Sequence, residues 1–286
     1  MYIFCSPCIL NPALRAEGIT KPSDVALFER VIERCREFEI EMVPLPCPET
    51  LYLGPDREPG TFLERLNTPE FSRVLARCIA GVNQIVAQRG PPLAIVGVNS
   101  SPTCGVTATY YGSEAGEDPK REGRGVFLSE FPEIDAFDVR EFGRFHVYLA
   151  APLFSESERM YNKTIANLLR ENLFSVYLPQ EAGDDSASRS RSEQERMFLQ
   201  HVEALERTDL IVAVIDGADA DSGTSWEVGY AYARKKPVIA LRTDFRHVGT
   251  AEKVNLMLEE SSMVASSREE IPALLRMATA GTPAKK

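Results

Sequence analysis

The chain has 286 residues, of which 44% are hydrophobic and 26% are charged. These values are ordinary for a globular protein and exclude collagen-like, coiled-coil and disordered classes for most of the sequence. Lys and Arg number 32 against 42 Asp and Glu, and the formal charge of −10 argues against sequence-independent binding to nucleic acid or to an anionic membrane.

Membrane insertion and export are not indicated by the sequence. The longest apolar runs, Leu93–Val98 and Leu210–Ile215, fall far short of the roughly 20 residues that a membrane-spanning helix needs. Met1–Leu10 lacks the basic flank and the cleavage pattern of a signal peptide, and we interpret it as beginning with a strand. Six cysteines without an export signal favour a reducing compartment, so we expect a cytoplasmic protein without a disulfide framework.

Strands and helices are expected to alternate in the first half. The pattern predicts, in order, a strand over Tyr2–Phe4, a helix over Ser23–Phe38, a strand over Glu41–Leu45, a helix over Ser72–Arg89 and a strand over Leu93–Val98. Cys35 and Cys78 lie on the apolar faces of the two helices, and we interpret them as core residues. The polar, glycine-rich stretch 112–125 is expected to form a long exposed loop.

The alternation returns in the second half. It predicts strands over His146–Ala150, Phe174–Leu178, Leu210–Ile215 and Pro237–Leu241, with helices over Ser157–Asn172, Ser192–Arg207 and Ser225–Arg234. The predicted fold class is therefore α/β, with two tandem Rossmann-like domains that each have a mostly parallel sheet flanked by helices. We expect a first domain over 1–130, a linker over 131–144, a second domain over 145–278 and a flexible tail over 279–286.

The segment Leu210–Gly229 combines a buried strand, an acidic loop and a helix start, at the sheet edge where α/β proteins bind ligands. We expect Glu227 in the first turn of the helix, where the helix dipole favours the ionised carboxylate. Such a carboxylate can attack the anomeric carbon of a sugar while a second acid, here Asp221, protonates or orients the leaving group. The alternative is a capping box from Thr224 to Glu227, and spacing alone does not separate the two.

The second half resembles the nucleoside 2-deoxyribosyltransferase family over about residues 145–260. The resemblance is carried by His146–Ser155, Asp209–Ala213, Asp221–Ala231 and Lys236–Val238. It implies that Glu227 is the nucleophile, that Asp221 is the general acid and that Tyr148 orients the nucleophile. It further implies a reaction in which a base is exchanged on, or hydrolysed from, 2-deoxyribose through a glycosyl-enzyme ester.

Other residues of this half have weaker assignments. The family usually has a base-binding aspartate where this chain has His201, so the resemblance leaves the base preference open. Asp244 and Arg246 follow a strand at the same sheet edge and are candidate substrate-binding residues, with a salt bridge inside the loop as the alternative. Val254–Met257 resembles a segment that family members donate to a neighbouring subunit, which implies a homo-oligomer with Asn255 at the substrate.

Three cysteines of the first half, Cys8, Cys47 and Cys104, each follow a predicted strand in turn-forming sequence. If the strands are parallel, the three thiols converge at one sheet edge. Together with Cys5 they would supply the four ligands of a structural zinc site. Cys5 and Cys8 alone have the spacing of a redox pair, and the residues by themselves leave both alternatives open.

The first half resembles the thiouracil desulfidase family over about residues 1–130. The matching segments are Cys8–Gly18, Pro46–Glu49 and Ser101–Gly105. The resemblance implies a four-iron four-sulfur cluster held by Cys8, Cys47 and Cys104, whose fourth iron has no protein ligand and can take the sulfur of a thiocarbonyl. It also implies that Glu49 is the acid/base carboxylate and that Ser101 positions the substrate. Asn11 stands where many members have glycine.

Both resemblances indicate a bifunctional enzyme of thiolated pyrimidine bases, nucleosides or nucleotides. One domain would remove sulfur and the other would make or break the bond to deoxyribose, so the expected partner is a small-molecule substrate and neither nucleic acid nor a membrane. The alternative from another class is a non-catalytic sensor that binds a modified nucleotide and has a structural metal site in its first domain.

Overall fold

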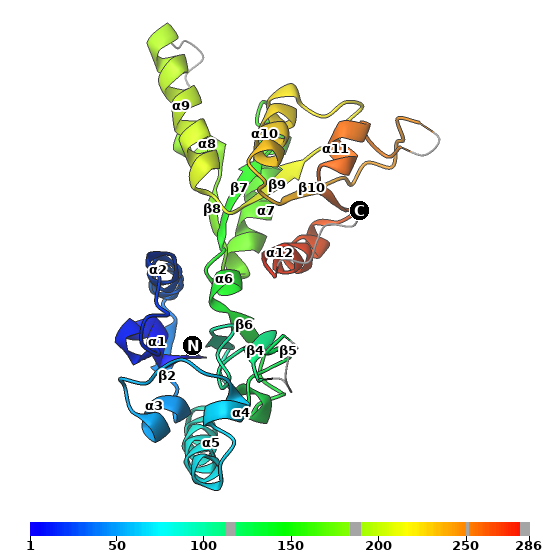
Figure 1. The fold of residues 1–286 in the computed structure, drawn as a ribbon. Helices are drawn as coiled ribbons and strands as arrows, with labels where there is room; N and C mark the ends of the chain where they lie inside the picture. Colours follow the sequence, from blue (N-terminus) through cyan, green and yellow to red (C-terminus); the bar gives the residue numbers. More distant parts are fainter. Residues whose placement is uncertain (113–117, 184–189, 250–251, 281–286) are drawn as a thin grey trace. The chain divides into compact units, whose positions relative to one another are not determined.

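The fold, given by a computed structural model that describes residues 1–112, 118–183, 190–249 and 252–280, is α/β with two separate parallel sheets (Figure 1). The chain divides into two compact units, Met1–Gly143 and Arg144–Lys286. Helices flank both sheets, which confirms the predicted fold class. Of the expected tail, Thr279 ends the last helix, and residues 281–286 lie outside the described residues.

The first unit contains a four-stranded parallel sheet with the order β2-β1-β3-β6. Its strands are β1 (Tyr2–Cys5), β2 (Glu41–Pro44), β3 (Ile95–Gly97) and β6 (Ala136–Asp138), and a separate antiparallel hairpin joins β4 (Ala108–Tyr110) to β5 (Lys120–Glu122). The helices are α1 (Pro7–Leu10), α2 (Pro22–Glu37), α3 (Pro48–Leu53), α4 (Phe62–Arg65), α5 (Pro69–Arg89) and α6 (Val139–Phe142), with 3-10 turns η1 (Pro12–Leu14) and η2 (Leu128–Glu130).

Two segments of this unit differ from the expectation. The stretch 131–144, expected as a linker, supplies β6 and α6, because β6 pairs with β3 as the edge strand of the sheet. The stretch 112–125, expected as an exposed loop, contains β5, which pairs with β4 although all three residues of β5 are exposed. Short charged strands of this kind carry little hydrophobic pattern, so periodicity does not reveal them.

One part of the core of the first unit lies between the sheet and α5, and α2 contributes further buried residues. Thr68 caps α5 by accepting a hydrogen bond from the amide of Phe71, and Pro69 occupies the first helical turn. Cys35 and Cys78 are buried, as expected for core residues. Gly97 lets the following loop cross β3 closely, since a Cβ there would lie 2.4 Å from the carbonyl oxygen of Cys104.

The second unit contains a five-stranded parallel sheet with the order β11-β10-β9-β7-β8. Its strands are β7 (His146–Ala150), β8 (Ser175–Tyr177), β9 (Leu210–Val214), β10 (Val238–Leu241) and β11 (Met263–Ala265). The helices are α7 (Glu156–Glu171), α8 (Pro179–Ala182), α9 (Arg191–Arg207), α10 (Ser222–Ala233), α11 (Leu256–Glu260) and α12 (Ile271–Thr279), with a 3-10 turn η3 (Arg268–Glu270).

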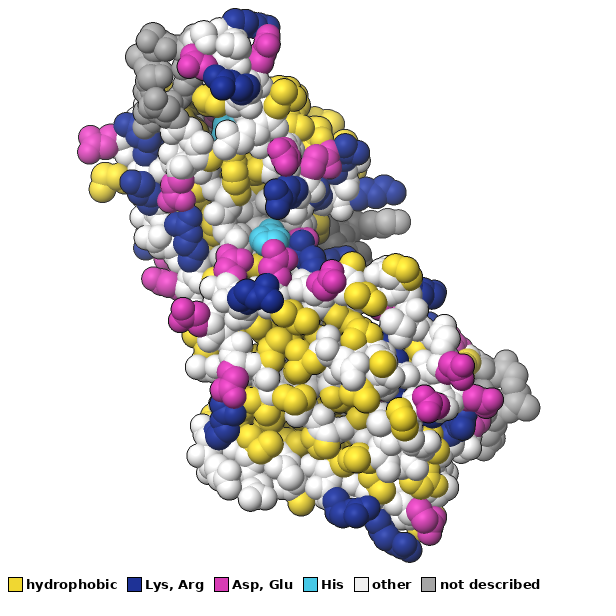
Figure 2. Space-filling model, turned by 90° about the vertical axis from the view of Figure 1, so that its left-hand side faces the viewer, with side chains coloured by type: hydrophobic (Ala, Val, Ile, Leu, Met, Phe, Trp, Pro, Cys, Tyr) yellow, Lys and Arg dark blue, Asp and Glu magenta, His cyan; other side chains and the backbone are white. Residues whose placement is uncertain are grey.

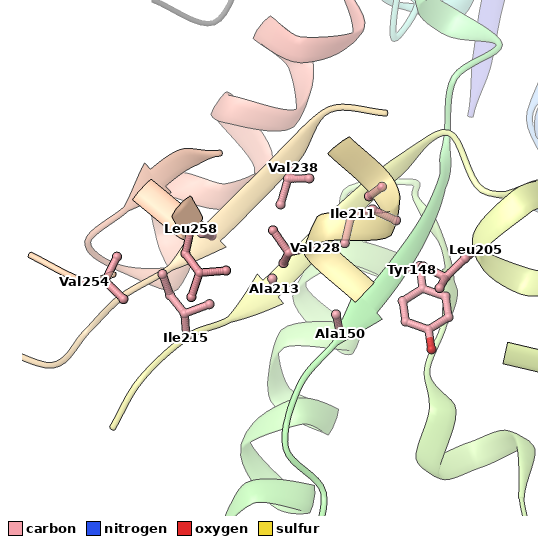
Figure 3. Close-up of a cluster of buried hydrophobic side chains, with 12 residues drawn as sticks. Tyr148, Ala150, Leu205, Ile211, Ala213, Ile215, Val228, Val238, Val254 and Leu258 are labelled. Atoms are coloured by element: carbon pink, nitrogen blue, oxygen red, sulfur yellow. The ribbon is translucent and has the colours of Figure 1, made fainter. Parts of the chain in front are cut away.

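The core of this unit lies on β7, β9 and β10 beneath α10. Figure 3 shows its aliphatic side chains, with Tyr148 beside Leu205 and the tyrosine hydroxyl directed away from that leucine. All five residues of β9 are buried, as befits a central parallel strand covered on both faces. The carboxyl ends of β7, β9 and β10 therefore bring the segments after Ala150, Val214 and Leu241 to one edge.

No helix within the described parts of the chain is long and apolar enough to span a membrane. Figure 2 shows basic and acidic side chains interspersed over the face that it displays. Although the whole chain has a net charge of −10, the acidic side chains on this face do not form one large patch.

Candidate functional site

The first unit has a cavity of about 950 Å³ at the carboxyl ends of its strands. Five residues singled out from the sequence line it together: Cys8, Cys47, Glu49, Ser101 and Cys104. They come from three places in the chain that β1, β2 and β3 bring to one edge. The fold therefore brings these residues together at one sheet edge, as the sequence predicts.

The three cysteines of the cavity are free thiols. Cys8 lies in α1, directly after β1, and Cys47 is the N-cap residue of α3, where its sulfur accepts a hydrogen bond from the amide of Thr50. Burial, and next the neighbouring Cys47, raise the pKa of Cys8 to about 12. The same two causes raise the pKa of Cys104 still more. Both thiols therefore lie within electrostatic reach of Cys47 in a poorly solvated site.

The iron–sulfur cluster implied by the resemblance needs three thiolates at one place. Cysteine thiolates are the ligands that such clusters use, so Cys8, Cys47 and Cys104 fit in chemical type and in their common cavity. Within the described residues, however, no group of three or more His, Cys, Asp and Glu side chains already has the arrangement of a metal site. That finding concerns the close ligand set of a single metal ion, whereas the thiolates that hold a four-iron four-sulfur cluster bind separate iron atoms and lie farther apart. The same finding gives no support to a preformed zinc site that includes Cys5.

Glu49 is the centre of a hydrogen-bond network in the cavity wall. Its Oε1 accepts hydrogen bonds from the hydroxyls of Thr103, at 2.6 Å, and Ser101, at 3.0 Å. Its Oε2 accepts one from Nε of Arg57 at 3.4 Å. The Ser101 oxygen in turn accepts hydrogen bonds from the amides of Thr103 and Cys104. The carboxylate is thus held by two hydroxyls and one guanidinium.

Arg57 and Thr103 are functional candidates that sequence reasoning missed. Both are buried, and Arg57 also donates to the carbonyl of Leu14 and to the Thr50 hydroxyl. A buried arginine normally needs a carboxylate partner, which is the one general signal that could have linked Arg57 to an acid. Nothing in the local sequence identifies Glu49 as that acid, because the pair forms only through the fold.

The second unit brings together Tyr148 and Glu227. Tyr148 on β7 is fully buried and donates its hydroxyl to Oε1 of Glu227 at 2.5 Å. Burial raises the pKa of Glu227 to about 7, the hydrogen bond from Tyr148 opposes this rise and the neighbouring charge of Asp221 adds to it. Burial and the adjacent carboxylate raise the pKa of Tyr148, so its hydroxyl keeps its proton. A carboxyl that titrates near neutral pH suits catalysis there.

The start of α10 differs from the expectation. The helix begins at Ser222, three residues before the expected start, so Glu227 lies in the second helical turn and the helix dipole does not set its ionisation. The N-cap is Asp221, whose Oδ2 accepts hydrogen bonds from the amide, at 2.9 Å, and the hydroxyl, at 3.2 Å, of Thr224. The alternative capping box from Thr224 to Glu227 is therefore wrong, and the capping role belongs to Asp221.

Tyr177 was not predicted as a site residue. It is the register partner of Tyr148 on the adjacent strand β8, and the two rings stack with centroids 5.2 Å apart and an angle of 22°. The Tyr177 hydroxyl lies 3.0 Å from Nδ1 of His201 on α9. His201 is partly buried and contacts the site through this hydrogen bond with Tyr177. The sequence does not give the pairing register of β7 and β8, and this register is what places Tyr177 beside Tyr148.

Asp244 and Arg246 pair with each other in the loop after β10. The guanidinium of Arg246 holds the pKa of Asp244 well below its usual range. Asp216, at the end of β9, organises the same loop by accepting hydrogen bonds from the amide and hydroxyl of Thr243, both at 2.6 Å. The salt bridge named as the alternative for Asp244 and Arg246 is thus formed, and Asp244 also accepts a hydrogen bond from the amide of Gly217, in the segment after β9.

Asn255 lies at the N-terminus of α11. Its side chain accepts a hydrogen bond from the amide of Met257 at 3.0 Å, and the neighbouring Val254 is buried in the core of the unit. The next residues, Leu256 and Met257, are 50% and 76% exposed. Large apolar side chains at such exposure leave a surface on which another chain can pack.

Both halves match known families. Residues 1–132 match the family model described as "Putative 2-thiouracil desulfurase", and residues 147–266 match that of nucleoside 2-deoxyribosyltransferase. These matches confirm the two resemblances and their order in the chain. The polypeptide thus joins regions similar to two families of base and nucleoside chemistry, which supports a role in the metabolism of modified nucleosides.

Individual relatives cover parts of the chain. A 2-deoxyribosyltransferase from Bacillus psychrosaccharolyticus is 25% identical, with a TM-score of 0.40, covering 46% of this chain and 95% of its own. A conserved protein from Enterococcus faecalis V583 is 29% identical, also with a TM-score of 0.40, over 46% of this chain and 98% of its own. An uncharacterized protein of Methanocaldococcus jannaschii is 23% identical over 56% of this chain and 85% of its own length.

Proposed function

We propose that the second unit transfers or hydrolyses the N-glycosidic bond of a 2-deoxyribonucleoside or its nucleotide, with Glu227 as the nucleophile. The observation that carries the proposal is the hydrogen bond from buried Tyr148 to Glu227, in a region that matches the nucleoside 2-deoxyribosyltransferase model. A carboxylate held by a tyrosine at the ligand-binding edge of a parallel sheet is suited to attack an anomeric carbon. The similarity of this region supports enzymatic activity.

The proposed reaction has two steps. The ionised Glu227 attacks C1′ of deoxyribose, and the base leaves with the electron pair of the glycosidic bond and takes up a proton. Asp221, which lies close enough for its charge to act on Glu227, is the proposed proton donor. Its protonated form gives the proton to the leaving base, and the carboxylate that remains takes up a proton again from solvent. Tyr148 keeps Glu227 oriented throughout. Water or a second base then attacks C1′ of the ester and releases Glu227, which gives hydrolysis or transfer.

For the first unit we propose desulfuration of a thiolated pyrimidine, with Cys8, Cys47 and Cys104 as ligands of a four-iron four-sulfur cluster. When bound, the cluster would supply an open iron that accepts sulfur. Glu49 would accept a proton from the water that attacks the thiocarbonyl carbon, because Thr103 and Arg57 hold its carboxylate in the cavity wall. Ser101, bonded to Glu49, would position the substrate.

The two activities together make the protein a bifunctional enzyme of thiolated pyrimidine bases, nucleosides or nucleotides in the cytoplasm. We propose a homo-oligomer whose interface includes the exposed Leu256 and Met257, which would place Asn255 near a neighbouring chain. Asp244 and Arg246 are proposed to contact substrate from the loop after β10. Size-exclusion chromatography with light scattering tests the assembly, and Met257→Glu is expected to shift it towards monomer.

The glycosyl proposal is tested with Glu227→Ala. Thiolated and ordinary pyrimidine 2′-deoxynucleosides, with and without a 5′-phosphate, are incubated with the protein and the free base is measured. Base release is expected to disappear in Glu227→Ala while binding measured by calorimetry persists, and Glu203→Ala on the exposed face of α9 serves as the control. Binding without base release by the unmodified protein would indicate a sensor instead.

The cluster proposal is tested by anaerobic purification followed by iron, sulfide and zinc analysis. About four iron and four sulfide per chain, with a brown colour, are expected. Replacing Cys8, Cys47 or Cys104 by serine should abolish iron binding, whereas Cys35→Ser in the core should leave it intact. Zinc in place of iron would contradict the proposal.

A further inference from the structure

A second polar pair lies next to Tyr148 and Glu227. The Tyr177 hydroxyl meets Nδ1 of His201 at 3.0 Å, and the two rings pack edge to face with centroids 6.0 Å apart. On its other side Tyr177 stacks on the ring of Tyr148. Three aromatic side chains from β7, β8 and α9 thus form a continuous contact that ends at the Glu227 carboxylate.

We propose that Tyr177 and His201 are positioning residues for Glu227: the hydrogen bond between them fixes the Tyr177 ring, and this ring fixes the Tyr148 ring that holds the carboxylate. The proposal rests on the proposed glycosyl chemistry of Glu227. Neither residue needs to touch the substrate, because both act through Tyr148.

Strand register makes this coupling rigid. Tyr148 and Tyr177 are partners in the parallel ladder between β7 and β8, so their side chains leave the sheet on the same face and side by side. The position of the Tyr148 hydroxyl is set by the direction of the axis from Cβ to the hydroxyl oxygen, and the Tyr177 ring stacked against Tyr148 limits how far this axis can tilt. The hydroxyl keeps its contact with Oε1 of Glu227 only while the axis stays in one direction. A displaced Tyr177 would leave that direction less defined.

Helix α9 links this arrangement to the outer part of the unit. The buried residue of α9 is Leu205, and His201 lies four residues earlier, on the same helix face. Leu205 and His201 therefore attach the C-terminal half of α9 next to the site. Figure 1 shows the other end of this helix projecting away from the sheet. The His201 contact is the point where α9 meets Tyr177.

The electrostatic surroundings of Glu227 provide a readout. The groups that act on its carboxyl are Tyr148 from β7 and Asp221 at the start of α10, and the charge of Glu227 in turn acts on Tyr177 from β8. The hydrogen bond from Tyr148 lowers the pKa of Glu227, whereas burial and Asp221 raise it. Loosening the Tyr148 ring therefore raises this pKa above about 7.

The test uses Tyr177→Phe, His201→Ala, their double variant and His201→Asn in the full-length protein. Tyr177→Phe keeps the ring and its packing, and His201→Asn keeps an acceptor near the position of Nδ1. Tyr232→Phe, at an exposed tyrosine of α10, is the control. Three quantities are measured: kcat and KM for base release, their pH profiles, and the pKa of Glu227 from ¹³C-glutamate NMR, with the resonance assigned by Glu227→Gln.

Tyr177→Phe and His201→Ala are each expected to lower kcat by about threefold to tenfold with KM unchanged, and the double variant should lose no more than either single one. Both should raise the pKa of Glu227, and His201→Asn should restore the original values. Unchanged kcat and unchanged Glu227 pKa in the two single variants would overturn the inference. If the unmodified protein releases no base, the proposed function fails, and the NMR titration still decides whether Tyr177 and His201 position Glu227.

Discussion

Removing the hydroxyl of Tyr148 tests the site of the second unit most directly. In Tyr148→Phe the buried ring is retained, and only the donor that lies 2.5 Å from Oε1 of Glu227 is lost. The pKa of Glu227 is about 7 because burial and Asp221 raise it while this hydrogen bond lowers it. The substitution removes the one opposing influence, so the pKa must rise.

The magnitude follows from the strength of such a bond. A hydrogen bond to a charged group contributes about 1.5–3 kcal/mol, which corresponds to about one or two pKa units and moves Glu227 to about 8–9. At pH 7 the ionised fraction falls from about one half to between about one tenth and one hundredth. The expected loss in kcat/KM at pH 7 is therefore about 5-fold to 50-fold from ionisation alone.

The assay is the pH dependence of base release from a 2′-deoxynucleoside between pH 5 and pH 10. In the unmodified protein the rate should rise with pH through about 7, because the ionised carboxylate is the nucleophile. In Tyr148→Phe the rate should rise only at higher pH, and at that pH it should partly approach the rate of the unmodified protein. Tyr232→Phe should follow the unmodified profile. An acidic limb that stays in place in Tyr148→Phe would refute this reasoning.

Three further predictions concern single residues. Glu227→Gln should stabilise the second unit by about 1–3 kcal/mol above pH 7 and should have no such effect below pH 4. A carboxyl whose pKa is raised in the folded state favours folding at low pH and loses this contribution as the pH rises through about 7. Urea unfolding above pH 7 and below pH 4 measures the difference in the free energy of unfolding. Asp221→Ala should lower the free energy of unfolding by about 1 kcal/mol, because the helix loses its N-cap. Asp221→Asn should keep the cap and the stability but should no longer release base. Full base release by Asp221→Asn would show that Asp221 is not the proton donor. Thr103→Val should lower the free energy of unfolding of the first unit by about 1–2 kcal/mol in urea, because it removes the buried hydroxyl that donates a hydrogen bond to Glu49. The control Ser72→Ala on α5 breaks an exposed hydrogen bond and should be about as stable as the unmodified protein.

The sequence by itself determined the architecture of both units. Apolar runs such as Leu210–Val214 and amphipathic stretches such as Pro22–Glu37 carry their periodicity locally, so the strands and helices that were predicted lie within three residues of their observed bounds, whereas edge elements such as β11 and α12 were not predicted. Motifs indicated the two similar families and the candidate residues Cys8, Cys47, Cys104, Tyr148 and Glu227. Alternation of strands and helices was enough to predict that the three cysteines converge at one sheet edge.

The tertiary structure decided how the side chains of each site interact. Periodicity missed β6 because its three residues have no alternating pattern, and only pairing with β3 defines it. The contacts of Arg57 and Thr103 with Glu49, and the stacking of Tyr177 on Tyr148, join residues 8 to 54 positions apart in the chain. The raised pKa of Glu227 likewise depends on burial. Pair contacts and desolvation depend on which segments the fold brings together, and a local pattern contains neither.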